Sequence, residues 1–127
     1  MNNNTNRTSL FNRIKNYSDF CKEFKIKEFK ESDFLFLPKL QRIKAFNYHK
    51  IQNIVQFLNG KWRIDWTNSN QQKRYPYFIY NTGSGLGVYC SGVSCDCYFG
   101  QVAYFKDKET SDFVGKTFLD IYIELSK

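Results

Sequence analysis

Apolar residues recur every three or four positions in the first part of the chain, across residues 9–17. Residues 19–24 continue this spacing with Phe20 and Phe24 four positions apart. This period is typical of a helix that packs one face against a core, so we predict one or two short helices before residue 25. In residues 25–36 the pattern shifts toward alternation, and both a strand and an irregular link remain open.

Residues 38–59 carry the longest helical pattern. Pro38 stands where the first turn of a helix accepts proline, and Asn59-Gly60 supplies a left-handed stop. We therefore predict a helix of about 20 residues with basic side chains on or near its polar side. The apolar positions assigned to its mostly buried face are Leu40, Ile43, Phe46, Ile51, Ile54, Val55 and Leu58.

The second half of the chain has strand composition, followed by one more helix. Residues 74–80, 88–90 and 99–105 are short aromatic or apolar runs between Gly-containing turns, which predicts three antiparallel strands. Either Asp107 or Thr110 can cap the final helix. The stripe of this helix that should cover the sheet consists of Val114, Phe118, Ile121, Tyr122 and Leu125.

These elements predict an α+β fold with N-terminal helices, a three-stranded antiparallel sheet and a C-terminal helix packed on it. Residues 1–8 are rich in Asn and predict a disordered tail, and residues 9–127 predict a single α+β domain.

Charge is unevenly distributed along the 127 residues. The net charge of +7 divides into +6 for residues 1–50, +3 for residues 51–74 and −2 for residues 75–127. This asymmetry favours an acidic or anionic partner on the N-terminal half, although a basic surface can also serve only to keep a protein in solution.

The hydropathy of the chain predicts no association with a membrane. No stretch approaches the ~20 consecutive apolar residues of a membrane helix, and no apolar segment that could act as a secretion signal follows the polar start. We expect a cytoplasmic location, in which cysteines remain thiols.

Cysteine and histidine positions argue against a metal site and against catalysis. Cys90, Cys95 and Cys97, with Cys21 or His49, could in principle supply four zinc ligands, but they lack the paired C-x-x-C spacing of structural zinc sites. His49 is the only histidine and has no nucleophile motif beside it. We therefore expect no metal, no cofactor and no enzymatic activity.

The glycines Gly83, Gly85 and Gly87 have the spacing of a phosphate-binding loop. Such a loop joins a strand to a helix, whereas here it is predicted to join two strands. A hairpin turn is the better interpretation.

Basic and aromatic residues alternate in KWRIDW and QKRYPYF. Three interpretations stay open: the aromatic rings fill the core, they anchor a protein partner, or they stack on the bases of a single-stranded nucleic acid. The residues predicted to contact a partner are Arg42, Lys44, Lys50, Lys61, Trp62, Arg63, Trp66, Lys73, Arg74 and Tyr75.

The segments LNGKWRIDWTNSNQQKRYPYF and AYFKDKETSDFVGKTFLDIY resemble the C-terminal pattern of small accessory proteins of Bacteroidota bacteriophages and prophages. In that pattern LN-x-x-W-x-x-DW precedes an aromatic strand, and a strand that ends in Phe-Lys leads into a helix with G-x-x-F. The resemblance covers roughly residues 38–125 and departs from the pattern in residues 83–99 and in the N-terminal third. It is carried by Leu58, Asn59, Trp62, Asp65, Trp66, Tyr75, Phe78, Phe105, Lys106, Gly115, Phe118 and Tyr122.

The resemblance implies a phage origin and transfers no chemistry. Together with the small size, the positive charge and the missing catalytic set, it leads us to expect a counter-defence protein. The expected partner is a host protein, namely an RNA-guided CRISPR nuclease or its guide-RNA complex, with the type VI-B effector as the first choice. The alternative from another class is a basic module that binds single-stranded RNA or DNA.

Overall fold

The computed structural model describes residues 3–81, 85–94 and 103–127. Helices α1 (Asn3–Arg13) and α2 (Tyr17–Phe24) come first, followed by a short 3₁₀ turn, η1 (Glu31–Phe34), and the long helix α3 (Lys39–Asn59). Strands β1 (Lys73–Asn81) and β2 (Gly85–Ser94) form an antiparallel hairpin, and helices α4 (Lys108–Thr117) and α5 (Leu119–Ser126) end the chain.

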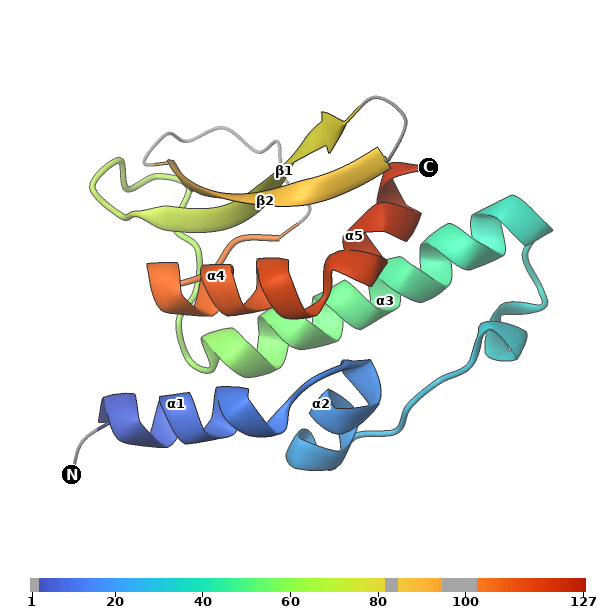
Figure 1. Ribbon diagram of the computed structural model, residues 1–127, viewed down its shortest axis with the longest axis horizontal. Coiled ribbons are helices and arrows are strands. Elements are labelled where there is room, and N and C mark those ends of the chain that lie inside the picture. The colour runs from blue at the N-terminus through green and yellow to red at the C-terminus, as the bar shows by residue number, and fades with distance from the viewer. Residues whose placement is uncertain (1–2, 82–84, 95–102) are drawn as a thin grey trace.

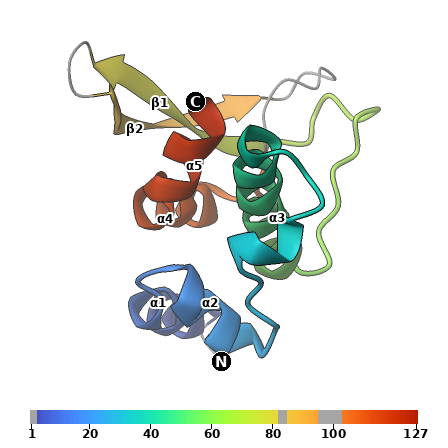
Figure 2. The same ribbon diagram turned by 90° about the vertical axis from the view of Figure 1, so that its right-hand side faces the viewer.

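The elements stack in three layers (Figure 1). The hairpin covers one side of a middle layer formed by α3, α4 and α5, and the α1–α2 pair lies on the other side. The view turned by 90° shows the same order, with α3 beside α4 and α5 (Figure 2). The core runs through the middle layer, where Ile51, Ile54, Val114 and Ile121 are fully buried.

The sequence predicted the long helix and the start of the helix that follows Asp107 correctly. Helix α3 starts directly after Pro38, and Gly60, which follows its last residue, has a positive φ of 58°. Helix α4 is capped by Asp107, whose carboxylate accepts a hydrogen bond from the Thr110 backbone N–H, so Asp107 and not Thr110 is the cap.

The predicted three-stranded sheet is wrong. The described residues contain a two-stranded sheet, in which Tyr75 pairs with Gly92 and Phe78 with Tyr89. Of the run 99–105 expected to form the third strand, the structure describes residues 103–105, and there Phe105 forms an isolated bridge with Arg74, with N···O distances of 2.6 and 3.0 Å. A single bridge suffices to bury Phe105, after which Asp107 turns the chain into α4.

Two further predictions need correction. Helix α1 begins at Asn3, so the predicted disordered tail at residues 1–8 is helical from Asn3 on. The final helix is broken at Phe118, whose φ of −111° and ψ of 30° separate α4 from α5. Residues 25–36, left open by the sequence, form an irregular link that ends in η1.

The side chain of Asn59 joins the end of α3 to the segment before α4. Its Nδ2 donates to the Tyr104 carbonyl oxygen at 2.9 Å, and its Oδ1 accepts from the Lys106 backbone N–H at 3.1 Å. Asn59 is buried, so one buried amide connects two backbone groups of this segment to the end of α3.

We predict that Asn59→Leu lowers the free energy of unfolding by about 1–3 kcal/mol, because it removes two hydrogen bonds that a buried side chain makes to the backbone. Urea denaturation followed by circular dichroism measures this change. Gln56→Leu, at an exposed position of the same helix, is the control and should change the value by less than about 0.5 kcal/mol. An equal effect of the two substitutions would contradict the role given to Asn59.

Candidate macromolecule-binding surface

The ten residues predicted to contact a partner fall into two groups toward opposite ends of α3. Arg42 and Lys44 lie in its N-terminal part and Lys50 lies near its middle, whereas the other seven follow its C-terminal end. A helix rises 1.5 Å per residue, so the 21 residues of α3 span roughly 30 Å. The structure therefore does not bring the predicted residues together into one surface.

Two of the three α3 cations predicted to contact a partner are engaged within the chain. The Arg42 guanidinium donates to the Leu37 carbonyl oxygen at 3.2 Å. The Lys50 ammonium lies 4.1 Å from the centre of the Phe46 ring, a cation–π contact. Lys44 is exposed, which makes it the member of this group best placed to meet a partner.

Lys73 is fully buried, although its charge suggested a contact residue. Its ammonium donates to the carbonyl oxygens of Asn68 and Gln71 at 3.3 and 3.1 Å and lies 5.5 Å from the centre of the Trp66 ring. A buried ammonium is stable only when such acceptors replace water. Lys73 thus holds the loop before β1 in place.

The same loop is stabilised further by Asp65 and Gln71. The Asp65 carboxylate accepts hydrogen bonds from the Thr67 backbone N–H and hydroxyl, which lower the pKa of this carboxyl below its ordinary value. The Gln71 side chain accepts from the Asp65 N–H at 2.8 Å and donates to the Arg63 carbonyl oxygen at 2.9 Å. These bonds give the loop a defined shape before any partner binds.

Two aromatic residues of the second group pack inside the protein. Trp66 meets the buried Tyr104 edge to face at 5.2 Å between ring centres, and Tyr75 meets the same ring at 5.7 Å. The Tyr75 ring also covers Gly92 on β2, where an added Cβ would come within 2.6 Å of it. Both rings are half-buried and anchor the hairpin to the segment before α4.

Lys61, Trp62 and Arg63 form the accessible part of the second group. Lys61 and Arg63 are exposed, and Trp62 and Arg63 border a shallow pocket of about 340 Å³ beside the C-terminal turns of α3. Arg63 donates to the carbonyl oxygens of Gly60 and Trp62, which fixes the direction of its guanidinium. Arg74 is half-buried and donates to the Gln72 side chain.

The sequence reasoning missed an apolar patch formed by Leu35, Phe36 and Leu40 at the start of α3. The exposed fractions of these residues are 64%, 78% and 79%, the highest among the exposed large apolar residues. The spacing of apolar residues predicts Leu40 on the buried face of α3, and this prediction is wrong. The run LFLP before the helix was the available signal, since three large apolar residues next to a helix-starting proline exceed what a link needs.

The side chain of His49 contacts the Asn53 amide and packs against an aromatic ring. The Asn53 amide nitrogen lies 3.2 Å from His49 Nε2 and 2.9 Å from the Tyr17 hydroxyl, and the His49 ring meets the Phe29 ring edge to face. Burial raises the pKa of the Tyr17 phenol and of the Cys21 thiol. Both groups therefore stay neutral at physiological pH, which disfavours their use as a nucleophile.

Metal sites and membrane spans were sought in the part of the chain that the structure describes. No group of three His, Cys, Asp or Glu side chains there is placed to hold a metal ion, and no helix there is long and apolar enough to cross a bilayer. Cys95 and Cys97, which the sequence analysis considers as zinc ligands, lie outside the described residues, as does the side chain of Cys90.

We predict that Lys73→Met, which keeps the apolar stem and removes the ammonium, lowers the free energy of unfolding by about 1–3 kcal/mol because Asn68 and Gln71 lose a buried donor. Lys61→Met removes the same charge at an exposed position and should change it by less than about 0.5 kcal/mol. Chemical denaturation of both variants makes the comparison, and equal stability would show that Lys73 does not hold the loop.

No known protein family, curated protein sequence or solved structure matches this chain. The resemblance to phage accessory proteins therefore stays a prediction, and the function must be argued from the chain's own surface.

Proposed function

We propose that this chain is a non-enzymatic counter-defence protein that binds and inhibits an RNA-guided CRISPR nuclease. The observation that carries the proposal is the apolar patch of Leu35, Phe36 and Leu40. Exposing large apolar side chains to water costs about 25 cal/mol per Å², and folded proteins that carry such patches generally use them to bind other macromolecules.

Charge around the patch supports a protein partner with an acidic surface. Lys30, Lys39 and Lys44 are exposed and lie within five positions of the patch residues. The exposed carboxylates of Glu31 and Asp33 lie in the same segment, so the cations exceed the anions around the patch without surrounding it. Such a contact complements an apolar groove with a mainly acidic rim, in which the apolar part supplies affinity and the charges supply orientation. We infer that Phe36 and Leu40 enter such a groove.

The type VI-B effector is the first target because the phage resemblance points to Bacteroidota. Its guide-RNA channel is expected to be basic, so a protein with a net charge of +7 would not imitate RNA there. The inhibitor would bind an acidic exterior surface, a hinge or the bound guide RNA. This proposal implies that it acts in the cytoplasm of the host cell.

We predict that purified protein slows target-RNA cleavage by a type VI-B effector loaded with guide RNA, and that Phe36→Ser combined with Leu40→Ser weakens inhibition at least tenfold. Both side chains are exposed, so the double variant should keep its melting temperature. Titration of the inhibitor in a fluorescent RNA-cleavage assay measures the effect.

Tyr77→Ser combined with Ile79→Ser is the matched control, since these residues are the exposed large apolar residues of β1. Inhibition by this control at wild-type strength supports the patch. Inhibition that survives the Phe36 and Leu40 changes would place the contact elsewhere, and no inhibition of any CRISPR effector would remove the proposal.

A second candidate function, binding of single-stranded nucleic acid, is favoured by Trp62 and Arg63, which lie together at the pocket of about 340 Å³. An aromatic face can stack on a base while Arg and Lys meet phosphates. Under this function, affinity for labelled RNA falls steeply with salt as counterions are released.

For this alternative, we predict that Lys61→Glu combined with Arg63→Glu abolishes RNA binding in a fluorescence anisotropy titration. The patch variant with Ser at positions 36 and 40 serves as the control and should bind RNA unchanged. RNA binding that persists after charge reversal would count against this alternative.

A further inference from the structure

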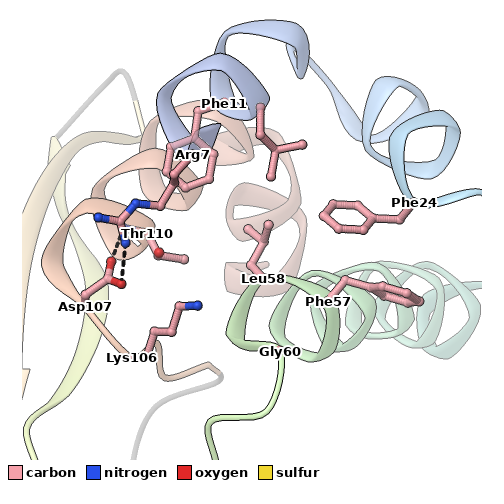
Figure 3. A pocket seen from close by; sticks show the side chains of 10 residues that line it. Arg7, Phe11, Phe24, Phe57, Leu58, Gly60, Lys106, Asp107 and Thr110 are labelled. Carbon is pink, nitrogen blue, oxygen red and sulfur yellow. Dashed lines mark hydrogen bonds and ion pairs between the residues drawn. The ribbon is translucent and has the colours of Figure 1, made fainter. Parts of the chain in front are cut away.

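A pocket of about 480 Å³ lies in the seam between the α1–α2 pair and the layer of α3 and α4 (Figure 3). It belongs to neither surface discussed above. Its volume falls in the range of roughly 300–1,000 Å³ that is typical of small-molecule sites. The pocket has an apolar side and a polar side, which together restrict the ligand it can hold.

The apolar side is built by α2 and α3. The rings of Phe24 and Phe57 lie 5.2 Å apart, and Leu58 lies between these rings and the polar side in Figure 3. Phe24 and Phe57 are half-buried, so an apolar ligand that covers them would remove further apolar surface from water.

The polar side contains the buried hydroxyl of Thr110. Thr110 lines the pocket and is only 1% exposed, and its Oγ1 has no hydrogen-bond partner within the described part of the chain. A buried hydroxyl without a partner is unfavourable, and an acceptor atom of a ligand would correct this. The Thr110 hydroxyl is therefore available to donate a hydrogen bond to a ligand.

Charge on the polar side favours an anion. Lys106 is exposed, and Figure 3 shows its side chain extending toward the pocket from the segment before α4. The carboxylate of Asp107 is paired with Arg7 at 2.7 Å, and Arg7 also pairs with Glu109. Arg7 balances the Asp107 carboxylate, and Glu109 does not line the pocket, so among the lining residues the Lys106 ammonium supplies the net positive charge that attracts a ligand.

We propose that the pocket binds a small amphiphilic carboxylate. The apolar chain lies against Phe24, Phe57 and Leu58, and the carboxylate accepts hydrogen bonds from the Lys106 ammonium and the Thr110 hydroxyl. This site is independent of the proposed inhibition of a nuclease, because the apolar patch contributes nothing to its lining.

Titration with three ligands of equal chain length tests the proposal: decanoate, decanol and decyltrimethylammonium, each below its micelle-forming concentration. Two-dimensional ¹H–¹⁵N NMR spectra of the full chain should show saturable shifts around Leu58 and Thr110, with decanoate binding most tightly. Equal affinity for all three ligands, or shifts centred on Leu35, Phe36 and Leu40, would overturn the proposal.

Variants separate the two donors from general charge effects. Lys106→Met and Thr110→Val should each weaken decanoate binding about tenfold. Lys44→Met makes the same charge change away from the pocket and should leave it unchanged. Thr110→Val should be at least as stable as the wild type because it removes an unpaired buried hydroxyl, so weaker binding cannot come from misfolding.

The Phe36 and Leu40 double variant should bind decanoate normally, which keeps this proposal distinct from the proposed function. Wild-type affinity in both pocket variants, or an equal loss in Lys44→Met, would show that Lys106 and Thr110 do not form a carboxylate site.

Discussion

The layers of this protein are held together by aromatic contacts around Phe118. This fully buried ring lies at the break between α4 and α5 and meets Phe20 of α2 edge to face at 6.1 Å, and Phe20 in turn meets Phe24 and Phe57. Such contacts are directional, so they fix angles between helices as well as distances. A second contact, the stack of Phe11 on Phe113 at 4.0 Å, ties α1 to α4.

This arrangement determines which surfaces remain open. The α1–α2 pair is attached through a few rings and the Arg7 ion pairs, which leaves space between them for a pocket. At its other end, α3 projects beyond α4 and α5 (Figure 1), and Leu40 in its first turn is 79% exposed. The same helix is therefore buried in the core at Ile54 and exposed to solvent at Leu40.

The sequence predicted what local chemistry decides and failed where tertiary packing decides. Pro38, Gly60 and Asp107 act on their own neighbours, so the bounds of α3 and the start of α4 were predictable. Helical spacing placed Leu40 on the face of Ile54 but could not indicate that the core ends before it. Likewise, the charge of Lys73 predicted a surface contact. Its burial depends on two carbonyl oxygens of a loop, and their position cannot be predicted from the spacing of residues.

The net charge includes cations that are already engaged by other groups of the chain. Arg42, Lys50 and Lys73 are engaged by carbonyl oxygens or aromatic rings of the chain itself. They therefore add to the electrostatic field of the protein but offer few free hydrogen-bond donors to a partner. The exposed Lys44 lies near the apolar patch, and the exposed Lys61 and Arg63 lie beyond the other end of α3. Because surface charges are screened by salt while apolar burial is not, affinity that depends on the patch should vary little with ionic strength. The salt dependence of binding therefore identifies which end of α3 a partner contacts.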